Sequence, residues 1–174
     1  PGPVIIDLPK DVQQSMCVPE YPEDVRFRGY KSPDHPGADD IRKIKELIHT
    51  SERPCIYAGG GIIASGAQKE LRRFAEEFNI PVATTLMGIG GIPESHPLSL
   101  KWLGMHGAYY ANYAVNESDL LLTFGARFDD RVTGKVSSFA ENAKIVHVDL
   151  DPSEINKNKR VDLGIVCDVK AVLK

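Results

Sequence analysis

The stretch PCIYAGGGIIA, residues 54–64, carries the pattern that decides the fold. Residues 54–58 are mostly apolar and predict a short buried strand. Three consecutive glycines follow, and residues 65–78 carry apolar side chains at helical spacing, with Ser65 as the expected N-cap. A strand that turns through glycine into a helix is the repeating unit of α/β proteins.

The same alternation continues on both sides of this stretch. Residues 38–50 and 105–116 have the pattern of helices, and another helix is expected to begin at Asp168. Further strands are predicted at residues 80–85, 119–124, 144–149 and 163–167. Strands separated by helices pair in parallel through right-handed crossovers. We therefore predict an α/β fold, with a doubly wound, mostly parallel sheet in a three-layer, Rossmann-like domain.

The N-terminal part of the sequence differs in composition from the rest. The apolar run at residues 4–8 predicts a short strand with no helix to cover it. Residues 13–37 are rich in proline and charge and predict an extended linker, with the compact domain at residues 38–174. Because the sequence opens with Pro1 and stops early in a predicted helix, we expect a piece of a longer polypeptide.

Composition and charge narrow the class of protein. The 174 residues are 42% hydrophobic and 26% charged, which is enough apolar sequence for one buried core. The formal net charge is -3 and the basic residues are scattered, so we expect no nucleic-acid partner. The apolar runs are much shorter than a bilayer requires, and no membrane partner is expected. Three cysteines without a C-x-x-C pair indicate reduced thiols, which predicts a cytoplasmic location.

The glycine run lies where ligands bind in open parallel sheets, at the carboxyl end of a strand. Residues 59–64 form a G-x-G-x-x-A pattern, which suits a pyrophosphate bound by backbone amides but also fits an ordinary strand-to-helix turn. The acidic residue that NAD sites place after the second strand is missing, because that strand ends in Thr84 and Thr85. Ordinary NAD binding is therefore disfavoured.

Carboxylates follow the later strands instead. Asp149 and Asp151 close one predicted strand, and Asp168 closes the next. Each could accept hydrogen bonds from ribose hydroxyls or from an adenine amino group. Alternatively, Asp149 or Asp151 caps the turn at Pro152, and Asp168 is the N-cap of the last helix. Spacing alone leaves both interpretations open.

The densest polar cluster is GARFDDRVTG, residues 125–134, directly after a buried strand. An arginine in this loop would bind a phosphate with forked geometry, although paired Arg and Asp residues also fit a self-neutralised surface loop. LGMHG, residues 103–107, offers small residues and a thioether on which a flat aromatic ligand could rest. His106 at this position more often caps or packs than binds a ligand.

Complete catalytic machinery is missing from the sequence. No His, Cys or carboxylate stands at metal-ligand spacing around His106, so we expect no metal site. There is no G-x-S-x-G elbow, no HExxH helix and no Walker lysine. These residues predict a site that binds a ligand without catalytic residues of its own.

Several longer strings are specific enough to identify a family. They are PGPVIIDLPKDVQ (1–13), YAGGGI (57–62), TTLMGIGGIP (84–93), LGMHGAYYANYAV (103–115), GARFDDRVTGK (125–135) and HVDLDPSEINKNK (147–159). Together they resemble the central domain of the catalytic subunit of acetohydroxyacid synthase (acetolactate synthase), a thiamine-diphosphate enzyme. The resemblance covers essentially the whole chain.

The resemblance implies a fold, a reaction and partners. In that family the middle of three domains binds FAD, and residues 1–12 would be the closing strand of the preceding pyrimidine-binding domain. The parent enzyme decarboxylates pyruvate and condenses the two-carbon unit with a second 2-oxo acid in branched-chain amino-acid biosynthesis. Thiamine diphosphate and Mg²⁺ bind outside this sequence. The implied partners are the flanking domains, a second subunit in a homodimer or tetramer, and a regulatory small subunit.

The resemblance also implies site residues at matching positions. The implied FAD contacts are Gly60, Thr85, Leu86, Leu103, Gly104, Met105, His106, Gly125, Ala126, Arg127, Phe128, Asp129, Asp149, Leu150, Asp168 and Val169. The positions that match the substrate channel are Lys10, Met105, Asp130 and Arg131. The family's FAD-binding arginine falls immediately before Pro1, so we expect FAD to be weakly bound by these residues alone. We also expect these 174 residues to have no synthase activity by themselves.

Two other functions remain open at this point. The first is a cofactor-free domain that only braces the catalytic domains of another thiamine-diphosphate decarboxylase or carboligase. It predicts a stability that does not depend on FAD. The second is a free-standing NAD or NADP oxidoreductase, which the missing acid after the second strand disfavours.

Overall fold

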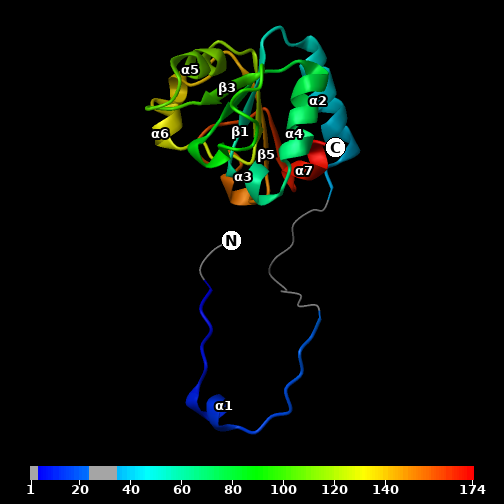
Figure 1. Cartoon of the computed structure of the whole chain (residues 1–174), viewed down its shortest axis with the longest axis vertical. Coiled ribbons are helices and arrows are strands. Elements are labelled where there is room, and N and C mark those ends of the chain that lie inside the picture. Colours follow the sequence, from blue (N-terminus) through cyan, green and yellow to red (C-terminus); the bar gives the residue numbers. More distant parts are fainter. Residues whose placement is uncertain (1–3, 24–34) are drawn as a thin grey trace. The chain divides into compact units, whose positions relative to one another are not determined.

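The computed structural model describes residues 4–23 and 35–174. The chain divides into two compact units, residues 1–31 and residues 32–174. Figure 1 shows the whole chain, and each unit is described here by itself.

The described part of the first unit has little regular structure. Residues 4–9 are extended and exposed, and they form no strand. They lead into one short helix, α1 (Lys10–Gln14), whose described residues are also exposed. A strand requires a paired neighbour, so the assignment of residues 1–12 to another domain's sheet remains a prediction. Of the predicted linker at residues 13–37, the part at 24–34 lies outside the described residues.

The second unit contains a parallel six-stranded sheet in the order β3-β2-β1-β4-β5-β6. Its strands are β1 (Pro54–Ala58), β2 (Val82–Thr84), β3 (Ser99–Trp102), β4 (Leu120–Phe124), β5 (Lys144–Asp149) and β6 (Leu163–Val166). Its α-helices are α2 (Ala38–Thr50), α3 (Gly60–Ala64), α4 (Gln68–Phe78), α5 (Tyr109–Asn116), α6 (Asp130–Thr133) and α7 (Val169–Val172). Single 3-10 turns are η1 (Leu86–Gly88), η2 (Val136–Ser138) and η3 (Pro152–Glu154). The predicted doubly wound α/β fold is confirmed.

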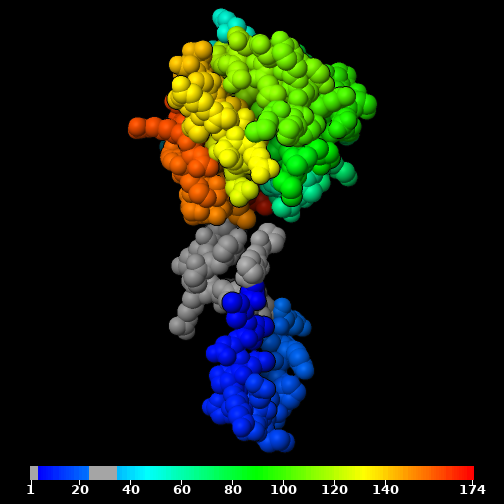
Figure 2. Space-filling view, turned by 90° about the vertical axis from the view of Figure 1, so that its left-hand side faces the viewer, coloured from blue at the N-terminus to red at the C-terminus, as the bar shows by residue number. Residues whose placement is uncertain are grey.

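Helices cover both faces of this sheet, which makes three layers (Figure 1). One face packs against α2, α3, α4 and α7. The other face packs against α5 and against the segment that contains α6 and η2. This segment is yellow in Figure 2 and forms part of the surface seen there. Successive strand residues point to opposite faces, so Ile56 belongs to the first core and Tyr57 to the second.

Local backbone conformation accounts for three differences from the predicted elements. The helix expected at residues 65–78 begins only at Gln68, because Gly66 has a φ of +62° and ends the short helix α3 before it. Ser65 is therefore not an N-cap, and its hydroxyl donates to the carbonyl oxygen of Gly61 at 2.8 Å. The helix expected at 105–116 begins only at Tyr109. Strand β3 was not predicted; it is short and its pairing with β2 is irregular.

The amino ends of the strands are joined by a carboxylate. Asp119, just before β4, accepts hydrogen bonds from the backbone N–H groups of Glu52 at 2.7 Å and Arg53 at 2.9 Å. These bonds connect the turn that precedes β1 to the neighbouring strand. Within the described residues no helix is long and apolar enough to cross a membrane.

Candidate cofactor-binding edge of the sheet

The predicted FAD contacts lie in the segments that follow the strands. Because the paired strands are parallel, their carboxyl ends share one edge of the sheet. The loops after β2, β3 and β4 hold Thr85, Leu103 and Gly125. Asp149 is the last residue of β5, and the segment after β6 holds Asp168. At about 4.8 Å per strand, the outermost loops are about 24 Å apart. The edge is therefore long enough for an extended ligand, and the strand order reverses between β1 and β4.

Glycines let two loops pack backbone against backbone at this reversal point. A Cβ on Gly59 would lie 2.1 Å from the carbonyl oxygen of Gly125, and one on Gly61 would lie 2.6 Å from the Gly125 Cα. The N–H of Gly59 donates to the Phe124 carbonyl oxygen at 2.9 Å, and that of Gly61 donates to the Gly125 carbonyl oxygen at 3.0 Å. Much of the G-x-G-x-x-A pattern thus serves the strand-to-helix turn, with those two amides already used.

The loop after β4 is not neutralised by ion pairs of its own. Among the described residues no carboxylate lies within ion-pair distance of Arg127 or Arg131. Asp129 instead caps α6, accepting a hydrogen bond from the Arg131 N–H at 3.0 Å. Arg127 is exposed, so its guanidinium can reach a phosphate.

Two buried side chains bind the same loop from the sheet side. The Nε2 of His147 lies 2.9 Å from the carbonyl oxygen of Ala126, and the hydroxyl of Tyr57 donates to that of Arg127 at 3.5 Å. Burial lowers the pKa of His147, and burial, together with the charge of Asp129, raises the pKa of Tyr57. The sequence analysis missed both residues. The sequence did contain a sign of them, because Tyr57 and His147 each place a ring with a polar atom in a mostly apolar predicted strand.

The loop after β3 is joined to the loop after β4. The Met105 N–H donates to the Arg131 carbonyl oxygen at 3.0 Å. Gly104, with a φ of +113°, donates its N–H to the Asn112 side chain, which donates back to the Gly104 carbonyl oxygen. His106 does not cap α5, whose N-cap is Ala108, and its side chain is exposed. Asn112 is a second supporting residue that the sequence analysis missed.

The three carboxylates at the far loops act as caps. Asp149 accepts from the Asp151 N–H at 2.9 Å, and Asp151 accepts from the Ser153 N–H at 2.8 Å. Asp168 is the N-cap of α7 and accepts from the Lys170 N–H at 2.7 Å. The capping interpretation is therefore confirmed. A carboxylate has a second oxygen, so capping leaves Asp149 and Asp168 able to accept a ribose hydrogen bond.

Apolar side chains are exposed along the same edge. Leu86 is 62% exposed, Met105 73% and Leu150 42%, although these residues commonly lie inside proteins. A flat ring system would cover such side chains, the phosphates would meet Arg127, and the ribose hydroxyls would meet carboxylates. The residues present therefore fit an extended flavin dinucleotide.

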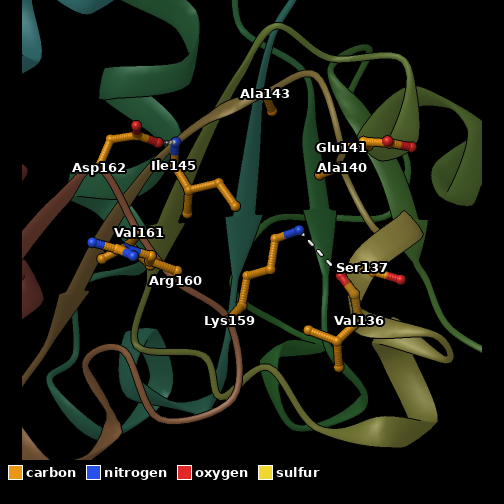
Figure 3. Close-up of a pocket in the computed structure, with 10 residues that line it drawn as sticks. All are labelled: Val136, Ser137, Ala140, Glu141, Ala143, Ile145, Lys159, Arg160, Val161 and Asp162. Carbon is orange, nitrogen blue, oxygen red and sulfur yellow. Dashed lines mark hydrogen bonds between the residues drawn. The ribbon is translucent and has the colours of Figure 1, made fainter.

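The clearest hollows of the described residues lie elsewhere. One of about 380 Å³ lies between η2, the start of β5 and the segment before β6 (Figure 3). The Lys159 ammonium at its wall donates to the carbonyl oxygens of Val136 at 3.1 Å and Phe139 at 2.7 Å. A second, of about 390 Å³, lies beside the start of α4. Neither is lined by a predicted cofactor contact.

The cysteines of the described chain are free thiols. Cys55 and Cys167 are buried, as predicted, and Cys17 is exposed. Burial raises the pKa of Cys55 to about 12 and that of Cys167 to about 11, so both stay protonated and unreactive near neutral pH. Within the described residues no group of three or more His, Cys, Asp and Glu side chains could hold a metal ion.

Comparison with protein families decides the relationship. The model for the central domain of thiamine pyrophosphate enzymes matches residues 41–174. The chain belongs to this family. The chain is 56% identical to the "Probable acetolactate synthase 2, chloroplastic" of Oryza sativa subsp. japonica. It is 53% identical to the "Acetolactate synthase 1, chloroplastic" of Zea mays and 52% identical to the "Acetolactate synthase 2, chloroplastic" of Nicotiana tabacum.

These matches cover all of this chain and only part of each relative. The covered share is 26% of the rice and tobacco proteins and 27% of the maize protein. The chain thus spans about a quarter of the length of the curated relatives it matches. The resemblance to the acetolactate synthase central domain is confirmed.

The predicted cytoplasmic location is wrong. The three relatives named above are chloroplastic enzymes, which points to a plastid rather than to the cytoplasm. The prediction rested on reduced cysteines. A reduced thiol reports the redox state of a compartment and not its identity, so it cannot separate the cytoplasm from a reducing organelle.

Proposed function

We propose that this central domain binds FAD in a plastid acetolactate synthase. That enzyme would decarboxylate pyruvate and condense the two-carbon unit with a second 2-oxo acid in branched-chain amino-acid biosynthesis. The strand order carries the FAD proposal, because it is the order of dinucleotide-binding sheets, in which the ligand lies across the reversal point. Here the exposed apolar side chains, Arg127 and the carboxylates all lie along that edge.

Each loop has a separate part in this proposal. Arg127 would bind the pyrophosphate, while Asp149 and Asp168 would accept hydrogen bonds from ribose or adenine. Leu86 and Met105 would lie against the flat ring system. FAD supplies no net redox chemistry to the main reaction in the resembled family, so these residues would bind and orient the ligand rather than transfer electrons.

The substrate channel is proposed at one end of the same edge. Met105 and Arg131 are joined by a backbone hydrogen bond, and Asp130 and Arg131 are exposed at the start of α6. Lys10, in α1, belongs to the other unit, and its assignment to the channel remains a prediction. We propose that flanking domains bind thiamine diphosphate and Mg²⁺. A homodimer or tetramer and a regulatory small subunit belong to the same proposal.

FAD titration tests the binding proposal. Flavin fluorescence should show saturable binding to the chain. At a free FAD concentration of about one hundred times Kd, mass action should raise Tm by about 5–10 °C. Arg127→Ala should raise Kd about tenfold to a hundredfold, through the loss of a charge-assisted hydrogen bond. Arg160→Ala, which removes another exposed arginine at the hollow of about 380 Å³, is the matched control and should leave Kd unchanged.

Absence of binding and of stabilisation at saturating FAD would overturn the assignment of these contacts. Flavin absorbance in the purified full-length enzyme is the second measurement. The 174 residues alone should form no acetolactate from pyruvate. Measurable turnover would contradict the proposal that flanking domains bind the catalytic cofactors.

A cofactor-free bracing domain is the second candidate. It is favoured by the glycine turn, whose Gly59 and Gly61 amides already donate to backbone oxygens, and by the capping roles of the aspartates. This candidate predicts that Tm does not change with FAD and that Arg127→Ala and Arg160→Ala behave alike. The titration described above therefore separates the two functions.

A further inference from the structure

Three polar side chains form a row across the middle of the sheet, on the face that packs against α5. Tyr57 of β1 is paired with Thr123 of β4, and Thr123 is paired with His147 of β5. All three are 0% exposed. The row crosses the point where the strand order reverses, directly beneath the loop that follows β4.

The two outer members of the row bind consecutive peptide groups of that loop. His147 meets the Ala126 carbonyl oxygen at 2.9 Å, and Tyr57 donates to the Arg127 carbonyl oxygen at a longer 3.5 Å. Both carbonyl groups therefore point toward the sheet. The side chain of Arg127 remains exposed and is therefore available to a ligand.

An aromatic ring completes the attachment. Phe128 is buried, and its ring centroid lies 5.9 Å from that of Tyr57 and 5.1 Å from that of His147, the latter in an edge-on arrangement. The Nε2 of His147 also lies 3.8 Å from the carboxylate of Asp149, the last residue of the same strand. The imidazole is thus near two predicted FAD contacts, Ala126 and Asp149.

We propose that His147 and Tyr57 are positioning residues that fix the 125–129 loop in its FAD-binding conformation. This inference rests on the proposed function of that loop. Two hydrogen bonds and an inserted ring order the backbone before a ligand arrives, so binding does not have to supply that ordering. His147 should contribute more, because its hydrogen bond is shorter.

The neutral imidazole is the form that suits this role. With its proton on Nε2, the ring donates to Ala126, while Nδ1 has no partner among the described residues. A second proton on Nδ1 would put an unpaired charge in the core, which burial disfavours. The carboxylates of Asp149 and Glu154 act in the opposite direction, but burial is the larger effect on the His147 pKa.

Four variants separate positioning from general support of the fold. His147→Leu removes the donor, whereas His147→Gln places an amide N–H near the former Nε2. Tyr57→Phe removes only the hydroxyl. Thr123→Val is the matched control, because Thr123 is equally buried in the same row and its hydroxyl has no partner among the described residues.

FAD affinity and loop order are measured on all four. We expect Kd to rise about tenfold in His147→Leu and about threefold in Tyr57→Phe, with partial rescue in His147→Gln and less than about twofold change in Thr123→Val. Amide hydrogen exchange without FAD should accelerate at residues 125–129 in His147→Leu, while the exchange of β1 and β4 stays slow. Visible circular dichroism of bound flavin should change in His147→Leu and return in His147→Gln.

The outcomes are separable from those of the proposed function. An unchanged Kd in His147→Leu, with FAD bound by the parent chain, overturns the positioning role, and so does a failure of His147→Gln to restore any affinity. If the parent chain binds no FAD, the proposed function fails. Amide exchange in His147→Leu then decides by itself whether His147 orders the loop. Faster exchange at residues 125–129 supports this role, and unchanged exchange overturns it.

Discussion

The row Ile56–Leu122–Val146 and the row Tyr57–Thr123–His147 occupy the same three strands, one residue apart. Every member of both rows is 0% exposed, yet the first is wholly aliphatic and the second is polar. The first faces α2, α4 and α7, and the second faces α5 and the loop after β4. The two rows are thus equally buried but differ in the kind of contact that they make on the two faces of the sheet.

The difference follows from the direction dependence of the forces involved. An aliphatic row contributes through the apolar area removed from water and through close packing, neither of which selects one orientation of a neighbour. A hydrogen bond to a named carbonyl oxygen does select one, because it requires a short distance and near-linear geometry. We infer that the aliphatic row mainly supports stability and the polar row mainly supports the shape of the loop.

Truncation of the aliphatic row should have the largest effect on stability. Leu122→Ala should lower the free energy of unfolding by about 2–5 kcal/mol, because it removes buried methyl groups and leaves a cavity. Chemical denaturation measures this, and Thr123→Val, the next residue along the same strand, is the control. A decrease in the free energy of unfolding of less than about 1 kcal/mol in Leu122→Ala would contradict the inference that this row mainly supports stability.

The carboxylate at the amino ends of the strands should have an intermediate effect. Asp119→Ala should lower the free energy of unfolding by about 1–2 kcal/mol, since two backbone N–H groups lose their acceptor. Burial opposes ionisation, but the bonds from Glu52 and Arg53 hold the Asp119 pKa below its usual value. Its contribution is therefore present at neutral pH and is lost only below about pH 4. FAD affinity should not change. A higher Kd for FAD in Asp119→Ala would show that the amino ends of the strands also affect ligand binding.

Mild acid should affect the polar row in particular. Burial lowers the pKa of His147, so the unfolded chain binds this proton more readily than the folded chain. Stability from this group is complete above about pH 6.5 and falls with decreasing pH, by at most about 1.4 kcal/mol per pH unit. Denaturation of the parent chain and of His147→Gln between pH 5 and 7 measures it. Identical pH slopes would show that His147 is not held neutral.

The smallest effect is expected from the long hydrogen bond. Tyr57→Phe should lower the free energy of unfolding by only about 0.5–1 kcal/mol, because the ring and its contact with Phe128 remain. Differential scanning calorimetry measures this difference. A loss as large as that of Leu122→Ala would show that both rows support stability alike.

Alternation of strands and helices made most of the fold predictable. The apolar runs at Cys55–Ala58 and Leu120–Phe124 became neighbouring central strands, and the carboxylate caps at Asp151 and Asp168 were among the open interpretations. Strand β3 escaped prediction, because it is short, only partly buried and irregularly paired, with Lys101 at a φ of +59°. The start of α5 was misplaced because Gly104 and Gly107 make a tight turn before it.

The candidate site, too, was only partly predictable from the sequence. Its loops could be located because parallel strands bring all their carboxyl ends to one edge, whatever the details of packing. The supporting residues could not be located, because Tyr57 and Arg127 are 70 positions apart and His147 and Ala126 are 21 apart. Strand register decides which of these groups meet, and local periodicity contains no information on register.

By itself, the sequence determined the order of strands and helices, and therefore which residues stand at the ends of strands, since hydrophobic periodicity and glycine turns are local properties. The tertiary structure alone decided that Tyr57, Thr123 and His147 lie side by side, and that the outer two reach one loop. The physical reason is that hydrogen bonds act over about 3 Å, and only the assembled sheet brings such distant residues that close.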